Sequence, residues 1–140
     1  MSLPYPDDLT SLVLRTHFAD AGAWEDLRAA IDAADEYQHA TYVSDPRFDE
    51  VSVQALVDEE AAADEDEQIV HVFLADAATM SDPSYPLLAV DLADEPGRTF
   101  RLPAQWFPDV SANLSIANMD FAEYADATDE AGTFRGFARD

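Results

Sequence analysis

The feature that most restricts the fold is an apolar run at residues 68–75, with the sequence QIVHVFLA. This run is nearly continuous in apolar residues and rich in β-branched and aromatic ones, which is typical of a strand covered on both faces. Residues 87–92, LLAVDL, repeat the pattern and predict a second buried strand. Buried strands require helices or loops on both faces of their sheet. The chain has 140 residues, enough for one such domain and too few for two of ordinary size.

Further segments have strand character. Residues 12–18 alternate between two faces and predict a half-buried strand, and residues 40–43 predict a short one. Residues 95–98 carry Pro and Gly at the positions that a type II turn requires. This turn predicts that residues 99–102 fold back on the preceding strand as an antiparallel partner. An edge strand is expected at residues 132–137.

The first helix is predicted at residues 21–34. Trp24, Leu27 and Ile31 recur at helical spacing and form one apolar stripe. Asp20 precedes the segment and is expected to act as its N-cap.

Two shorter helices complete the expected set. One begins near Ser52, and the other covers residues 119–127 with Asn118 as its cap. Residues 76–86 and 103–116 contain prolines and are expected to be irregular.

This order of elements predicts a single globular domain over residues 1–140. Its class is α/β or α+β, with a mixed sheet of about five strands and about three packed helices. Residues 1–11 are expected to be an irregular lead-in. Residues 58–67 are predicted to form an acidic loop or a solvated helix end, because such a block of like charges repels itself.

The charge balance narrows the classes of partner. Thirty acidic residues against seven basic ones give a formal net charge of −23, while a hydrophobic content of 48% indicates a folded domain. This charge argues against direct contact with nucleic acid or an anionic membrane surface, since phosphates would be repelled. The chain has no cysteine, and no apolar run approaches the ~18 residues of a membrane span. The expected location is therefore the cytoplasm.

All the basic residues are arginine, and lysine is absent. Together with abundant Ala and Asp, this is typical of a GC-rich coding sequence. A salt-adapted protein would show the same acidic excess, because salt screens the self-repulsion. Function, genome composition and salt adaptation are all open as causes of the acidity.

Two segments resemble a known family. Residues 12–27 and 90–137, which include EPGRTFR, NLSIANMDF and FRGF, are similar to an uncharacterised family of small actinobacterial proteins known only as a domain of unknown function. The resemblance implies a free-standing, cytoplasmic, bacterial domain. It implies no activity, so no functional residue is carried over from it. Residues 58–67 have no counterpart in the resemblance.

No pattern of catalytic or cofactor-binding residues stands out. His17, His39 and His71 lie in no nucleophile motif, and His71 is expected to be a core or near-core imidazole with a local hydrogen-bond partner. Zinc-ligand spacings are absent, and the acidic block lacks the glycine and spaced ligands of a calcium loop. The four glycines do not form a phosphate cradle. We therefore expect no catalytic residue, no metal and no cofactor, and the sequence weighs against an enzyme.

The candidate partner-binding residues fall in three groups. Arg98, Arg101 and Trp106 are residue types enriched at interface hot spots. In so acidic a protein, however, arginines are more often paired with neighbouring carboxylates such as Asp91 or Asp120. Trp106 also suits a plug that closes one end of the core. Asn118 and Asp120 lie at a helix entrance, where capping explains one of them. The remaining candidates are the consecutive acids Asp64, Glu65, Asp66 and Glu67.

The function favoured by these observations is a non-enzymatic interaction module that binds a basic protein, as immunity proteins and inhibitors do. Strong charge of one sign speeds encounter with such a partner and rejects like-charged competitors. One alternative is an enzyme or small-ligand binder with an unrecognised site, which predicts a concave pocket with perturbed pKa values. The other is a salt-adapted or nucleic-acid-mimicking acidic protein.

Overall fold

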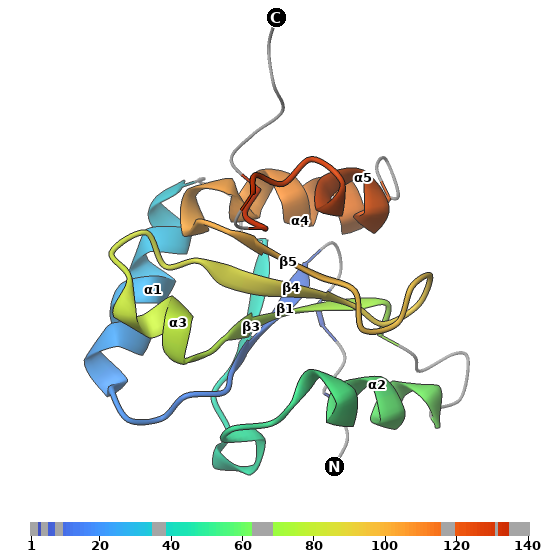
Figure 1. Ribbon diagram of the computed structural model, residues 1–140. Helices are drawn as coiled ribbons and strands as arrows, with labels where there is room; N and C mark the ends of the chain where they lie inside the picture. Colours follow the sequence, from blue (N-terminus) through green and yellow to red (C-terminus); the bar gives the residue numbers. More distant parts are fainter. Residues whose placement is uncertain are drawn as a thin grey trace, which may run out of the picture.

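The computed structural model describes residues 3, 6–7, 10–34, 39–62, 69–115, 120–130 and 132–134. Five strands form one sheet in the order β2-β1-β3-β4-β5 (Figure 1). β1, β2 and β3 are parallel, while β4 is antiparallel to β3 and to β5. The strands are β1 (Ser11–Arg15), β2 (Ala40–Val43), β3 (His71–Ala75), β4 (Leu87–Asp91) and β5 (Thr99–Leu102).

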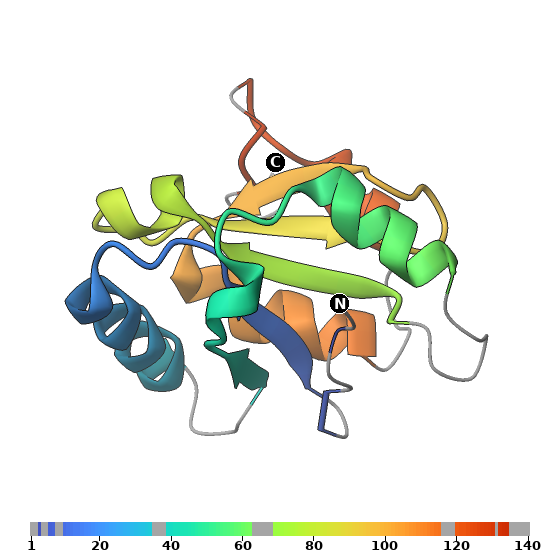
Figure 2. The ribbon, with the colours of Figure 1, turned by 90° about the horizontal axis from the view of Figure 1, so that it is seen from below.

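Helices cover both faces of the sheet. They are α1 (Ala21–Ala34), α2 (Val53–Ala61), α3 (Ala77–Ser81), α4 (Phe107–Ser115) and α5 (Phe121–Ala125), with short 3₁₀ helices at Pro46–Phe48 and Ala104–Trp106. The apolar residues of α1, α4 and α5 pack on one face, and those of α2 pack on the other. Figure 2 shows α2 lying across the face opposite α4. The predicted single domain with a mixed five-stranded sheet is confirmed, and its class is α+β.

The first strand is more buried than its alternation suggested. All five residues of β1 are buried, because it lies between β2 and β3 under helices on both sides. Leu12 and Leu14 join the α2 side of the core, and Val13 joins the other side. The prediction of a half-buried strand over residues 12–18 was wrong, because the strand ends at Arg15 and Arg15 is a buried polar side chain that alternation alone assigns to solvent. Ser11, which precedes the predicted segment, is also part of β1 and is buried.

The predicted first helix and the predicted hairpin are both present. Asp20 Oδ1 accepts a hydrogen bond of 3.0 Å from the N–H of Ala23, at the start of α1. At the hairpin, Glu95 O accepts 2.9 Å from Arg98 N, and Gly97 has a φ of 94°. This left-handed conformation is the one that the third position of a type II turn requires.

Two helices lie where irregular chain was expected. In α3, Asp76 and Thr79 form a capping box that starts a single short turn of helix. In α4, Pro108 is the second residue, where a missing N–H costs no intrahelical hydrogen bond. Pro108, which the sequence analysis interpreted as a loop signal, therefore allows α4 to begin.

The ends of the described chain also differ from expectation. α5 begins after Asp120, whose main-chain N–H donates 3.2 Å to Glu123 Oε2, whereas the predicted cap, Asn118, lies outside the described residues. The expected edge strand is reduced, within the described residues, to one bridge between Thr133 and Arg101 beside β5. Residues 135–137 lie outside the description. Within the described residues, no helix has the length and apolar character needed to cross a membrane.

The predicted acidic loop begins inside a helix. Its first residues continue α2 to Ala61. Glu60 is buried, and its carboxylate accepts 2.9 Å from the N–H of Ile69. Glu60 therefore ties the end of α2 to the chain that leads into β3.

Candidate functional site

A hollow of about 210 Å³ lies where β3 and β4 meet α4 and α5. β3 and the residue before it contribute His71 and Val70 to its lining. β4 and the chain that follows it contribute Asp91 and Asp94. From the helical layer come Leu114 of α4, Phe121 of α5 and Asp120, the residue before α5. The hollow therefore combines an imidazole, three carboxylates and an apolar wall.

Asp91 is the buried carboxylate of this hollow, with 3% of its surface exposed. One of its oxygens accepts from the N–H groups of Ala93 (2.9 Å) and Asp94 (3.2 Å), and the other accepts 3.0 Å from Glu95. Three main-chain donors stabilise an ionised carboxylate without cancelling its charge. Asp91 therefore shapes the loop before the hairpin turn and adds negative charge to the hollow.

His71 lies opposite Asp91 in the antiparallel pairing of β3 and β4. Its Nε2 atom is 2.9 Å from Ser11 Oγ, and its ring meets that of Phe73 edge-on at 5.7 Å. Burial lowers the pKa of His71 from 6.5 to about 4, against a smaller upward effect from the Asp91 charge. The imidazole is neutral near pH 7. The prediction of a core or near-core imidazole with a hydrogen-bond partner is confirmed, and the partner, Ser11, lies on the neighbouring strand β1 and not nearby in the sequence.

A chain of hydrogen bonds assigns the tautomer of His71. Ser111 Oγ is 2.9 Å from His39 O, and a carbonyl oxygen only accepts, so the single hydrogen of the Ser111 hydroxyl is used there. Ser11 must then donate across the 2.8 Å contact between the two hydroxyls. The Ser11 hydrogen is thereby used as well, so Nε2 of His71 donates to Ser11. A neutral imidazole carries one N–H, which leaves Nδ1 as a bare acceptor.

This arrangement does not support a serine hydrolase. A nucleophilic hydroxyl must reach its substrate, yet Ser11 is 1% exposed and Ser111 is fully buried. The oxygens of Asp91 bind main-chain N–H groups, whereas a triad carboxylate would accept from the imidazole. The chemistry that this lining supports is the binding of a hydrogen-bond donor.

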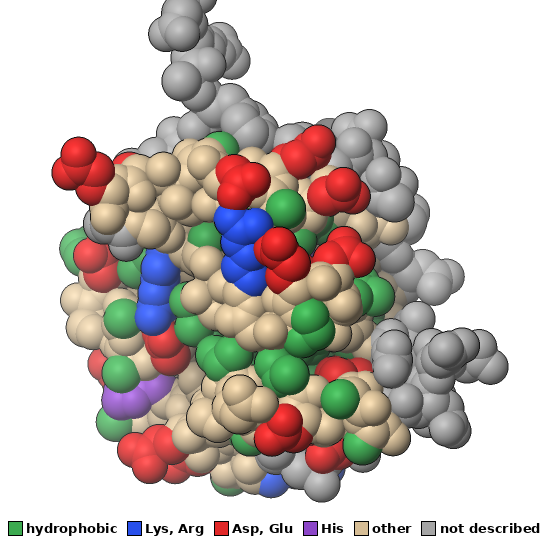
Figure 3. Space-filling model, turned by 45° about the vertical axis from the view of Figure 1, so that its right-hand side comes forward, with side chains coloured by type: hydrophobic (Ala, Val, Ile, Leu, Met, Phe, Trp, Pro, Cys, Tyr) green, Lys and Arg blue, Asp and Glu red, His purple; other side chains and the backbone are tan. Residues whose placement is uncertain are grey.

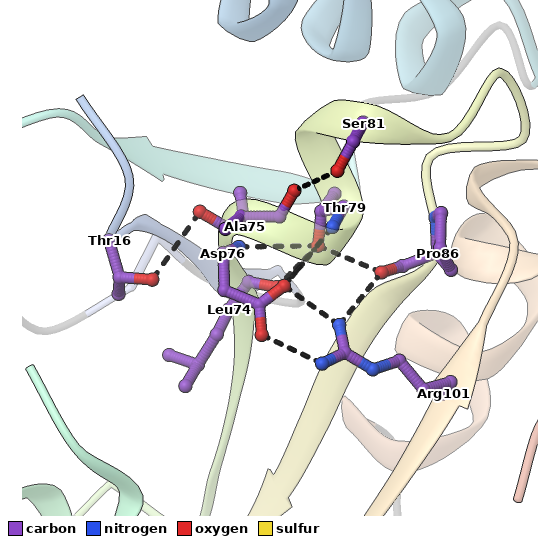
Figure 4. Close-up of polar contacts among 9 residues, drawn as sticks. Thr16, Leu74, Ala75, Asp76, Thr79, Ser81, Pro86 and Arg101 are labelled. Carbon is purple, nitrogen blue, oxygen red and sulfur yellow. Dashed lines mark hydrogen bonds and ion pairs between the residues drawn. The ribbon is translucent and has the colours of Figure 1, made fainter. Parts of the chain in front are cut away.

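A second polar cluster lies at the carboxyl end of β3 (Figure 4). The guanidinium of Arg101 donates to both carboxylate oxygens of Asp76, each at 2.8 Å, and also to Pro86 O at 3.2 Å. Asp76 accepts in addition from the main-chain N–H of Thr79 (3.1 Å) and from its hydroxyl (3.0 Å). Burial alone would raise the pKa of Asp76, but the hydrogen bonds from Arg101 and Thr79 outweigh it and hold this pKa below its usual value. The cluster fastens β5 to the start of α3.

Arg98 and Trp106, the candidate partner-binding residues grouped with Arg101, also make contacts within the fold. Arg98 pairs with Glu95 at 2.7 Å and with Asp126. Trp106 is partly buried, with its ring 5.8 Å from that of Phe134, edge-on. The ion-pair interpretation of the arginines therefore describes their contacts, although the partners are Asp76, Glu95 and Asp126 in place of Asp91 and Asp120.

Among the described residues, the structure does not bring the site residues predicted from the sequence together at one site. Asp120 lies in the hollow, whereas the other candidates in its group and in the acidic block lie outside the described residues: Asn118, Asp64, Glu65, Asp66 and Glu67. The sequence did not single out Asp94 or the pairing of His71 with Asp91 as parts of a site. The signal that could have found the pair is that His71 and Asp91 are polar residues within two apolar runs. Pairing these runs as antiparallel strands with the two polar residues opposite each other gives the observed register.

A larger hollow, of about 390 Å³, lies between the end of α1, the loop before β4 and the 3₁₀ helix Ala104–Trp106. Its described lining consists of alanines and prolines with Ser84, Tyr85 and Gln105, and no charged side chain is among these residues. The described lining therefore lacks the converging polar groups that would specify a ligand.

These features define a small α+β domain with one acidic hollow at the junction of its sheet and two helices. The chain belongs to the family described as a domain of unknown function, DUF6924, whose model matches residues 10–137. This confirms the resemblance to an uncharacterised family. No curated protein matches the chain.

Proposed function

We propose that this domain is a non-enzymatic interaction module that binds a basic protein partner. The observation that carries the proposal is that every arginine in the described part of the chain is already engaged inside the molecule. The acidic surplus is then left to the surface, where it attracts positive charge.

The arginines are engaged in two ways. Arg15 is buried, donates to His17 O at 3.1 Å and stacks over the ring of Phe18. The other four described arginines pair with carboxylates: Arg28 with Glu25, Arg47 with Asp45, Arg98 with Glu95 and Asp126, and Arg101 with Asp76. Figure 3 shows one face on which arginine side chains lie against acidic ones while further acidic side chains surround them.

A surface of this kind favours a cationic partner over an anionic one. The formal net charge is −23, and charges of one sign over a small domain produce a field that steers oppositely charged proteins. The same field repels nucleic acids and anionic membranes. The proposal also includes a cytoplasmic location, which the absence of cysteine supports. It further includes an actinobacterial source, which the family resemblance implies and the lysine-free composition fits.

The test is capture of partners from source-cell lysate by the tagged domain at low and at high salt, followed by mass spectrometry. The expected result is one basic protein, recovered near equal stoichiometry and released by salt, that binds the purified domain in a two-component assay. Recovery of no basic protein at either salt concentration would contradict the proposal. A domain that captures nothing and unfolds at low salt would instead be a salt-adapted protein.

A further inference from the structure

We propose that the hollow between β3, β4, α4 and α5 receives an arginine or lysine side chain of the basic partner, an inference that rests on the function proposed above. The cationic head would enter between His71 and Asp91, and its aliphatic stem would lie along the apolar wall. The lining supports this assignment at three points.

The first point is that the polar lining consists of acceptors. Nδ1 of His71 is a bare lone pair, because Ser11 accepts from the other ring nitrogen. His71 is largely buried, and no described group donates to Nδ1. Asp91, beside it, is a carboxylate whose donors among the described residues are main-chain N–H groups. Such a lining is complementary to a group that carries several N–H donors and a positive charge.

The second point is the acidic rim. Asp94 and Asp120 are exposed and approach the hollow from different elements, one after β4 and the other before α5. Together with Asp91 they place three carboxylates around one small opening, which no described arginine enters. A guanidinium or ammonium that leaves water there is compensated by charge-assisted hydrogen bonds.

The third point is the apolar wall. Val70 is 53% exposed and is the large hydrophobic side chain left exposed within the described residues. Leu114 and Phe121 line the hollow with it. Arginine and lysine carry an aliphatic stem that packs on such surfaces while the charged head reaches polar groups. An apolar wall suits an organic cation better than a metal ion. Consistent with this, no group of three His, Asp or Glu side chains among the described residues is arranged to hold a metal ion.

The experiment uses two small probes, N-acetyl-arginine methylamide and N-acetyl-citrulline methylamide. Citrulline has nearly the shape of arginine but replaces the guanidinium with a neutral urea. We expect the arginine probe to shift the ¹⁵N resonance of His71 Nδ1 and the amide resonances of Val70 and Asp94. The citrulline probe should bind about tenfold more weakly or not at all.

A charge-matched pair of variants locates the binding. Asp94→Asn with Asp120→Asn removes two carboxylates from the rim, and Asp26→Asn with Asp58→Asn removes two exposed carboxylates from α1 and α2. We expect the rim variant to bind the arginine probe about tenfold more weakly and the control variant to stay within about twofold of the unchanged protein. Equal binding of the two probes, or equal losses in the two variants, would overturn the proposal.

The same variants separate this inference from the proposed function. If both capture the basic partner as well as the unchanged domain does, the interaction module stands and the hollow is not its anchor point. If no basic partner is captured while the arginine probe binds at His71, the proposed function fails and the preference of the hollow for a cation holds.

Discussion

Ser11 Oγ lies 2.9 Å from His71 Nε2, although the two residues are 60 positions apart. The contact exists because β1 and β3 are neighbouring parallel strands whose side chains reach the same helical layer. It also determines the tautomer of the imidazole that lines the hollow, since the nitrogen that donates to Ser11 leaves the other one as an acceptor.

Removal of the Ser111 hydroxyl should reverse this tautomer. In Ser111→Ala, Ser11 no longer donates to Ser111 and is free to donate to His71 Nε2, so the proton is expected to move to Nδ1. The ¹⁵N chemical shifts of the imidazole distinguish the two forms directly. Ser111→Ala also leaves a carbonyl with one donor fewer, and we expect a stability loss of about 1 kcal/mol. An Nδ1–H tautomer in the unchanged protein would contradict the hydrogen-bond assignment.

The depressed pKa of His71 predicts a loss of stability in acid. The pKa is about 4 in the folded protein and 6.5 as the ordinary value, so between these pH values the unfolded chain takes up a proton that the folded protein does not. Stability should fall by about 3 kcal/mol as the pH drops from 6.5 to 4, with no contribution above 6.5. Asp91, Asp94 and Asp120 line the same hollow as His71, so His71→Gln, which keeps these carboxylates, is the reference. Urea denaturation at several pH values in this range should show a smaller decrease in the free energy of unfolding for His71→Gln than for the unchanged protein. If the free energy of unfolding fell equally with pH in both proteins, the prediction would be contradicted.

Trp24→Ala should destabilise the protein by about 3–5 kcal/mol, the cost of deleting a core aromatic side chain. Trp24 is 3% exposed on α1, and its ring meets that of Tyr42 edge-on at 6.0 Å. Trp106→Ala is the control, since Trp106 is only partly buried and should cost less. Chemical denaturation followed by far-ultraviolet circular dichroism measures both variants. A Trp24→Ala protein as stable as the unchanged one would contradict the packing of α1.

Much of the fold could be predicted because its signals are local. The stripe of Trp24, Leu27 and Ile31 predicts α1, and the Pro-Gly turn at residues 95–98 predicts the hairpin of β4 and β5. α4 was missed because Pro108 marks both a loop and a helix start, and only packing distinguishes them.

The site was less predictable because it depends on contacts between distant segments. Ser11 and Ser111 are 100 residues apart and meet only after α4 packs on the sheet. His71 and Asp91 each lie in an apolar run, and it is the antiparallel register that makes them partners. Asp120 was identified as a candidate from its position at a helix entrance, but nothing in the sequence indicated that it borders the same hollow.

The two arginines near the hairpin should respond differently to truncation. Arg101 donates to both oxygens of Asp76 in a partly buried pair, so Arg101→Ala is expected to cost about 1–3 kcal/mol, because Asp76 loses its fork of charge-assisted bonds. Arg101→Lys keeps the positive charge but cannot donate to both oxygens of Asp76 in the same planar arrangement, so it should recover part of the lost stability. Arg98 pairs with carboxylates at the surface, where ion pairs contribute little, so Arg98→Ala should leave the unfolding midpoint unchanged. Urea denaturation of the three variants checks the order. If Arg101→Ala matched the unchanged protein in stability, Arg101 would be dispensable for the fold and would return as a candidate for partner recognition.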